Sequence, residues 1–136
     1  MTVYKINDLV KFDFIKIPKT LFANPKYKEM SSDAKLTYAL LYDRLSLSIQ
    51  NNWINADGEV YLVYTRGAIA EDLGITYKKA IAAFKELKEN NLIIDKQCGH
   101  GMPNYIFIVK PELSDTEAKK YTNKENSRPA EMECLD

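Results

Sequence analysis

The clearest pattern of apolar and polar positions lies in residues 63–91, VYTRGAIAEDLGITYKKAIAAFKELKENN. Thr65 and Thr76 each precede an apolar-periodic segment, and threonine hydroxyls are good helix N-caps. Gly74 is placed to end the first segment in the left-handed conformation. Spacings of three and four mark one buried helix face, formed by Ile69, Leu73, Ala80, Ile81, Phe84 and Leu87. The pattern predicts a helix over residues 66–73, a tight turn, and a longer helix to about residue 90.

Two helices joined by a short turn with a glycine are typical of a helix-turn-helix, whose second helix enters the DNA major groove. The other faces of the predicted second helix carry Tyr77, Lys78, Lys79, Ala82, Lys85 and Lys88. An ordinary amphipathic helix pair with a lysine-coated solvent face would show the same pattern. On these residues alone, both interpretations stay open.

Another helix is predicted upstream, starting with Ser31 or Ser32 as its N-cap and ending near residues 49–50. Its broad apolar stripe predicts a core helix and consists of Leu36, Ala39, Leu40, Leu41, Leu45 and Leu47. Trp53 follows in a polar loop. We expect this ring to fold back on the core, the alternative being contact with a partner.

Three apolar segments have the composition of strands. Residues 59–64 follow an Asp-Gly turn, and residues 92–97 and 105–109 flank a glycine-rich tip. A hairpin directly after a recognition-type helix matches the winged-helix plan, with the hairpin tip as the wing. We therefore predict an α+β fold, a winged helix-turn-helix with a small antiparallel sheet of three strands.

The ends of the chain differ from its middle. Residues 1–14 hold apolar side chains, including Leu9, Val10 and Phe12, and predict an extended arm or a short strand. Beyond Pro111 the sequence is polar and predicts a short helical start followed by disorder. The expected organisation is a DNA-binding domain with an N-terminal arm over residues 1–110 and a disordered tail over 111–136.

Charge is unevenly distributed although the chain is neutral overall. Residues 1–110 contain fifteen bases and twelve acids, whereas residues 111–136 contain four bases and seven acids. Within residues 76–88 there are four lysines and one acid. A positive stripe on a weakly charged body supports modest, salt-sensitive DNA affinity, so tight binding would need more than one copy of the stripe.

The sequence offers no enzyme chemistry. Cys98 and His100 alone cannot complete a zinc site, which needs three or four ligands, and a glycine-flanked tip is a poor place to hold a base beside a thiol. We expect no cofactor and no metal. Two distant cysteines, no secretory signal core and no apolar run of membrane-spanning length predict a cytoplasmic protein without membrane association.

An ordered set of motifs resembles the N-terminal domain of the replication initiator protein A (RepA_N) family, over roughly residues 12–110. The matching pieces are Ile17-Pro18-Lys19, Tyr27-Lys28, Ser32-x-Ala34-Lys35-Leu36, Asp43-Arg44-Leu45-Ser46-Leu47-Ser48, Trp53-Ile54, Gly58-x-Val60-Tyr61, Leu73-Gly74, Lys78-Lys79-Ala80, Lys85-Glu86-Leu87, Leu92-Ile93 and Gly101-x-Pro103-Asn104.

The resemblance implies a dimeric winged-helix domain that binds repeated double-stranded sites at the replication origin of a plasmid or mobile element. It also implies recruitment of host replication proteins. Full-length family members carry a C-terminal domain, whereas this chain ends after the polar tail. Relatives often have basic wings. Here the wing carries Gln97, Cys98, His100 and Met102, and Lys96 is its only charged residue.

We expect Tyr77, Lys78 and Lys79 to reach base edges, with Ala82 against the groove floor. Thr65, Thr76, Lys85 and Lys96 are expected to hold phosphates, and His100 to reach the minor groove. Lys88 is a weaker candidate. The alternatives to an initiator domain are a winged-helix transcriptional regulator and a protein-interaction module that does not bind DNA. Salt dependence separates the last of these, because only phosphate binding weakens steeply with added salt.

Overall fold

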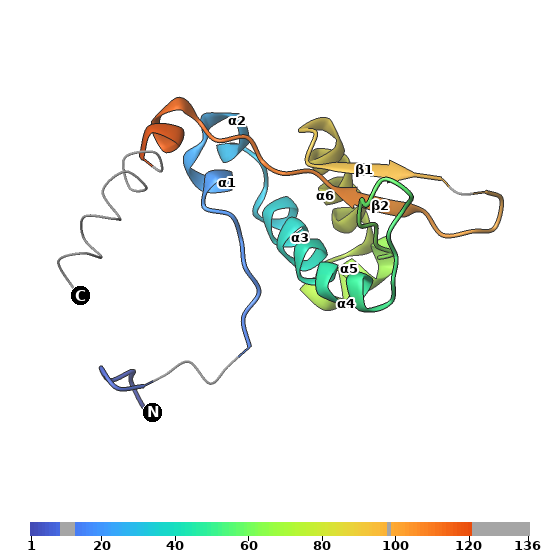
Figure 1. The fold of residues 1–136 in the computed structure, drawn as a ribbon. Coiled ribbons are helices and arrows are strands. Elements are labelled where there is room, and N and C mark those ends of the chain that lie inside the picture. Colours follow the sequence, from blue (N-terminus) through green and yellow to red (C-terminus); the bar gives the residue numbers. More distant parts are fainter. Residues whose placement is uncertain (9–12, 98, 121–136) are drawn as a thin grey trace.

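The computed structural model describes residues 1–8, 13–97 and 99–120. Its elements, shown in Figure 1, are helices α1 (Thr20–Ala23), α2 (Pro25–Lys28), α3 (Ser32–Asp43), α4 (Leu45–Gln50), α5 (Arg66–Leu73) and α6 (Tyr77–Glu89), then strands β1 (Ile93–Lys96) and β2 (Tyr105–Ile108). This order confirms the predicted winged helix-turn-helix with a small antiparallel sheet. No helix within the described ranges is long and apolar enough to cross a membrane.

The core lies where α3, α5 and α6 pack together and the hairpin β1–β2 covers them. Its fully buried side chains include Leu41 from α3, Ile69 from α5, and Phe84 and Leu87 from α6. Ile106 closes the core from β2. Each of these side chains, once buried, contributes roughly 1.5–3 kcal/mol of hydrophobic free energy. The buried face of α6 is thereby held inward, and its opposite face must lie in solvent.

The sheet has fewer strands than predicted. Within the described part of the chain it contains β1 and β2, whose register pairs Ile93 with Ile108 and Lys96 with Tyr105. The predicted strand over residues 59–64 is wrong, because Leu62 makes only an isolated bridge to Ile106. The chain leaves β2 immediately after Leu62, since Thr65 must begin α5. On the other side of Leu62, Val60 pairs with Ile54 instead.

The predicted single helix over residues 31–50 is also wrong in part. Ser31 is the N-cap as expected, and its hydroxyl accepts the Ala34 N–H at 3.1 Å. The helix ends at Arg44, however, whose N–H bonds to the carbonyls of both Leu40 and Leu41. The Arg44 guanidinium lies 4.3 Å from the centre of the Tyr64 ring, and this contact stabilises the break between α3 and α4.

Three predicted core side chains are exposed instead: Leu36, Leu47 and Ile81. The buried residues of α3 are Ala34, Lys35, Thr37, Tyr38, Ala39 and Leu41, so the predicted Ala39 and Leu41 are in the core. On α6 the buried position is Ala83 rather than Ile81. Trp53 is half-buried, and its ring lies parallel to that of Tyr61 with 6.3 Å between centroids. It therefore packs at the margin of the sheet.

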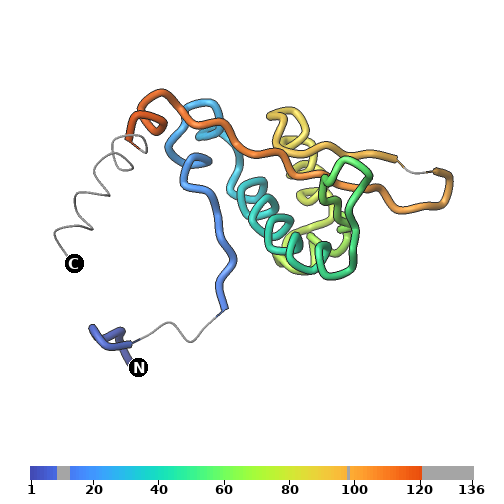
Figure 2. Tube along the Cα trace, in the orientation of Figure 1, coloured from blue at the N-terminus to red at the C-terminus, as the bar shows by residue number. Residues whose placement is uncertain are grey.

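The two ends of the chain behave differently. The described parts of the N-terminal arm, residues 1–8 and 13–19, contain no strand, and Val3, Tyr4 and Phe14 are exposed. Leu9, Val10 and Phe12 lie outside the described residues. After β2 the chain returns to α1 and α2 (Figure 2). There the backbone N–H of Glu112 donates to the Tyr27 hydroxyl at 2.9 Å, and its carbonyl accepts the Asn24 amide at 2.9 Å.

Residues 115–120 are helical, which agrees with the short helical start predicted for the tail. The Lys26 ammonium group also pairs with the Glu112 carboxylate at 2.9 Å. The beginning of the tail is therefore attached to the domain. The division at residue 110 and the disorder expected farther on stay predictions, since residues 121–136 lie outside the described ranges.

Tyr38 provides a test of the packing between α3 and the end of the hairpin. Its hydroxyl donates to the Val109 carbonyl at 2.9 Å, and burial raises its pKa to about 12. The neutral phenol is favoured in the folded state, so its contribution is complete below pH 10 and is lost as the pH rises from 10 to 12.

We expect Tyr38→Phe to lower the free energy of unfolding by about 1 kcal/mol at pH 8. This deficit should shrink by about 1.4 kcal/mol per pH unit above pH 10 and change sign, so that the variant is the more stable protein by pH 12. Urea unfolding of both proteins across this range measures the difference. Tyr42→Phe, which removes an exposed hydroxyl from the same helix, should change the free energy at pH 8 by less than about 0.5 kcal/mol. A Tyr38→Phe deficit that stays constant with pH would contradict the assignment.

Candidate nucleic-acid interface

Local hydrogen bonds build the helix-turn-helix as the sequence predicts. The Thr65 hydroxyl accepts the Ala68 N–H at 3.1 Å and begins α5. Gly74 ends α5 with a φ of 68°, a conformation that a side chain would strain. The Thr76 hydroxyl then accepts the Lys79 N–H at 3.2 Å and begins α6. These three residues fix the angle between the two helices and leave the start of α6 at the surface.

The exposed face of α6 carries the predicted reading residues. Tyr77, Lys78, Lys79, Ala82 and Lys85 are all exposed. Lys85 lies 4.0 Å from Glu89, but both side chains are more than 60% exposed, so this pair is weak. Its ammonium group stays available to a stronger anion.

Glu86, the only acid within residues 76–88, does not share this face. Its carboxylate accepts the backbone N–H of Ser31 at 3.0 Å and also the Ser31 hydroxyl. The charge is therefore used at the N-terminus of α3, where a carboxylate is favourable. As a result, the exposed face of α6 is positive although the chain is neutral.

A cleft of about 190 Å³ joins the helix-turn-helix to the hairpin. Thr65, Arg66 and Gly67 line it from the start of α5, Tyr77 from the start of α6, and the hairpin lines it with Pro103 and Asn104. Helix starts present N–H groups that have no partner within the helix. Two such starts facing one cleft, beside an arginine, form a surface suited to phosphate groups.

The remaining predicted residues lie on the wing. Lys96 is the last residue of β1, and His100 lies in the loop between the strands; both are exposed. Figure 1 shows that this loop projects beyond the helices. The structure thus groups Thr65 and Tyr77 around the cleft and leaves His100 at a separate tip. Cys98 lies outside the described residues.

Arg66 and Asp95 form a contact that the sequence analysis missed. The Arg66 Nη2 lies 2.8 Å from the Asp95 Oδ2, and the Asp95 side chain is only 3% exposed. Lys88, the weaker phosphate candidate, extends toward the same oxygen at 3.9 Å. A sequence signal existed, because the alternation in residues 92–96 puts Asp95 on the same face as Ile93. A charge on a core-facing strand position requires a partner.

Tyr64, in the segment before α5, makes a further side-chain contact to that helix. Its hydroxyl donates to the Asp72 carboxylate on α5. Burial raises the pKa of Tyr64 to about 12, and this hydrogen bond is the second contribution to the increase. The phenol therefore keeps its proton at neutral pH and holds the Asp72 carboxylate against the domain. Among the residues described, no group of three or more His, Cys, Asp or Glu side chains is placed to hold a metal ion.

Several known proteins resemble this chain. It is 31% identical over 110 residues to a 41 kDa protein of Lactobacillus helveticus, a match that covers 76% of the chain. The chain spans about a third (31%) of that protein's length.

Among solved structures, a chain described as the N-terminal domain of a DNA-binding protein is 33% identical with a TM-score of 0.74. A chain from a Rep–DNA complex is 33% identical with a TM-score of 0.73. Both matches cover 93% of this chain and 97% of the other. An MDR initiator structure is 35% identical with a TM-score of 0.71, and this match covers 91% of this chain and 98% of the other.

The sequence model of the replication initiator protein A (RepA) N-terminus matches residues 13–123. This stretch contains the whole helix-turn-helix and wing and reaches into the segment attached to α1 and α2. The chain therefore belongs to the RepA_N family, as a member of its N-terminal domain.

Proposed function

We propose that this chain is the DNA-binding domain of a replication initiator and binds repeated double-stranded sites at the origin of a plasmid or mobile element. The observation that carries the proposal is the exposed, positive face of α6 in a capped helix-turn-helix. Family membership and the likeness to a Rep–DNA complex support it. The second helix of such a motif lies in the major groove.

The proposed contacts follow from the positions of the side chains. The exposed start of α6 offers Tyr77, Lys78 and Lys79 to base edges, and Ala82 is small enough to lie against the groove floor. On either side of these bases, the helix starts at Thr65 and Thr76 and the ammonium groups of Lys85 and Lys96 contact backbone phosphates. His100 at the wing tip reaches the minor groove.

We propose that the chain binds as a homodimer. One copy presents three lysines on the α6 face, Lys78, Lys79 and Lys85, which supplies only a modest electrostatic term. Two copies on adjacent half-sites double the number of phosphate contacts, and two-fold protein symmetry matches repeated or palindromic DNA. Initiation itself and contact with host replication proteins are also proposals, because this chain spans only part of its 41 kDa relative. A cytoplasmic location is likewise a proposal, and membership of the RepA_N family supports it.

Lys79→Ala tests base reading. We expect this substitution to cost about 1–3 kcal/mol on the preferred duplex, because a base contact carries sequence discrimination. Its cost on a scrambled duplex should be smaller. Fluorescence anisotropy with a duplex selected by the wild-type chain from a random pool measures both costs. Lys28→Ala, which removes an exposed lysine from α2, is the matched control. Equal losses on both duplexes would make Lys79 a phosphate contact.

Lys85→Ala tests phosphate binding. We expect it to weaken binding to the selected and scrambled duplexes alike and to lower the slope of log K against log salt by about one. A salt series from about 50 to 200 mM gives that slope. An unchanged slope would remove Lys85 from the interface. If wild-type binding hardly depends on salt, apolar pairing with another protein becomes the better explanation of this surface.

The stoichiometry on DNA tests the homodimer. We expect two copies on a duplex that carries one complete site and one copy on a half-site. Native mass spectrometry of the full chain with each duplex distinguishes the two complexes. One copy on the complete site at saturating protein would contradict the dimer and leave the DNA-binding assignment standing.

A further inference from the structure

Asp95 is a buried carboxylate at the junction of the wing and the helix-turn-helix. It lies in β1 opposite Ile106 of β2, and its side chain is 3% exposed. Its neighbours on the inner face, Ile93 and Ile106, are core residues. A buried charge is costly unless it is paired, so the groups that contact the Asp95 carboxylate determine whether it is tolerated there.

Two cations from different helices meet this carboxylate. Arg66, the first residue of α5, places Nη2 2.8 Å from Oδ2, and Lys88 near the end of α6 places Nζ 3.9 Å from the same oxygen. The Arg66 guanidinium also lies 4.7 Å from the centre of the buried Phe84 ring. Asp95 therefore connects the wing to both helices of the DNA-binding motif.

This cluster is a poor device for stability alone. A buried ion pair often contributes no more than well-packed apolar side chains of the same volume, because both charges lose their hydration. Moreover, the Asp95 Oδ1 is buried with no hydrogen-bond partner among the described residues. What the cluster provides is a fixed orientation of β1 relative to α5. The Arg66 guanidinium is a planar, rigid donor and holds the Asp95 carboxylate in one orientation.

The consequence concerns the cleft that faces DNA. Arg66 lines this cleft together with Tyr77 of α6 and Asn104 of the hairpin. The bond from Arg66 to Asp95 therefore holds the start of α5 against β1, and so relates the helix-turn-helix to the hairpin on the two sides of this cleft. Without it, the hairpin would keep its backbone bridge from Ile106 to Leu62 and its apolar contacts, but it would lose a directional side-chain bond to α5.

We propose that Asp95 is a positioning residue that fixes the wing relative to the recognition helix and so allows both to contact one duplex. The inference rests on the proposed DNA binding. It assigns to Asp95 no contact with DNA; the residue acts through Arg66 and Lys88. Changing Asp95 should therefore remove the contact between the wing and DNA, while α6 still contacts the stretch of duplex that it reads.

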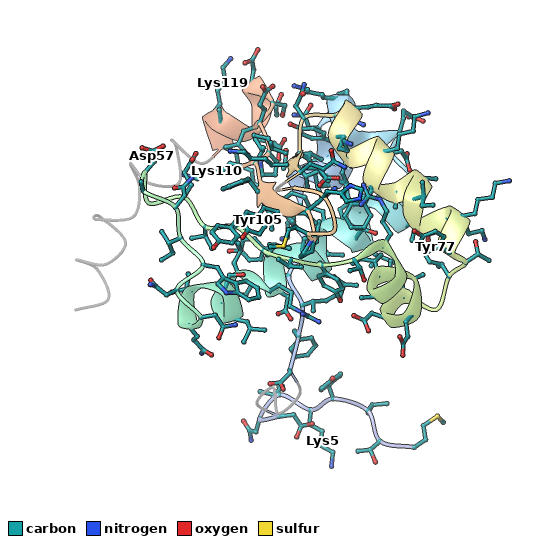
Figure 3. All side chains as sticks on the ribbon, turned by 90° about the vertical axis from the view of Figure 1, so that its right-hand side faces the viewer. Lys5, Asp57, Tyr77, Tyr105, Lys110 and Lys119 are labelled. Carbon is teal, nitrogen blue, oxygen red and sulfur yellow. The ribbon has the colours of Figure 1, made fainter. Side chains whose placement is uncertain are left out.

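Asp95→Ala and Asp95→Asn test the proposal, because alanine removes the bond and asparagine keeps the shape and a neutral acceptor. Asp57→Ala and Asp57→Asn are matched controls with the same charge change. Asp57 is exposed in the loop between α4 and α5, and Figure 3 shows it on the side of the molecule opposite Tyr77. All four variants, each made in the whole 136-residue chain, are compared with wild type on the selected duplex, below the temperature at which circular dichroism shows unfolding.

We expect Asp95→Ala to raise Kd about tenfold, Asp95→Asn to raise it less, and both Asp57 variants to bind as wild type does. In a hydroxyl-radical footprint, Asp95→Ala should lose protection of the flank contacted by the wing and keep protection of the central tract. Asparagine should restore part of the flank. This pattern separates positioning from general destabilisation, which would weaken both tracts together.

Unchanged flank protection in Asp95→Ala, or proportional loss of flank and centre in the folded variants, would overturn the proposal. If Asp95→Ala does not fold, Asp95→Asn decides by the same footprint. Failure of the wild-type chain to protect any duplex is a different result, because it rejects the proposed DNA binding itself. The two failures are therefore distinguishable.

Discussion

Burial of one face of α6 is the constraint on which the rest of the structure depends. Phe84 and Leu87 are completely buried, and α6 packs against α3, α5 and β1. Because an α-helix is a rigid cylinder, this burial determines which side chains face solvent. The exposed, lysine-bearing face of α6 is therefore a consequence of core packing. The Arg66 guanidinium stacked over Phe84 connects the same buried ring to the wing.

A neutral chain presents a positive face on α6 because several of its acids form hydrogen bonds or ion pairs at junctions between elements. Glu86 accepts hydrogen bonds at the start of α3, Asp72 accepts the Tyr64 hydroxyl, and Asp95 pairs with Arg66. Each carboxylate thereby stabilises a junction between elements, and none of the three pairs with Lys78, Lys79 or Lys85 in the structure. Net charge alone is a poor guide to such a protein, because only the charges left at the surface act on a polyanion.

The segment after the hairpin belongs to the same architecture. Glu112 contacts Asn24, Lys26 and Tyr27 on the α1–α2 pair, and the family match extends to residue 123. Composition changes near Pro111, but this change does not coincide with the end of the attached structure. Polar residues can be held by hydrogen bonds to a distant part of the chain, and composition does not record those partners.

The sequence by itself determined the parts whose forces are local. Thr65 and Thr76 cap their helices through N–H groups three residues away, Gly74 adopts the conformation that other residues avoid, and the hairpin follows from two apolar segments around a glycine-rich tip. The exposed α6 residues were predictable for the same reason, because helical period alone places them. Period alone nevertheless misplaced Ile81, which is exposed, and missed Ala83, which is buried in its place.

Only the tertiary structure decided the features whose partners are distant. The segment around Leu62 forms a single bridge, because the start of α5 draws the chain away from β2. The guanidinium of Arg44 lies over the ring of Tyr64, twenty positions along the chain, where α3 gives way to α4. The Arg66–Asp95 pair joins residues 29 positions apart. Periodicity assigns a residue to a face, but the three-dimensional packing selects which groups meet there, and that selection relates the wing to the recognition helix.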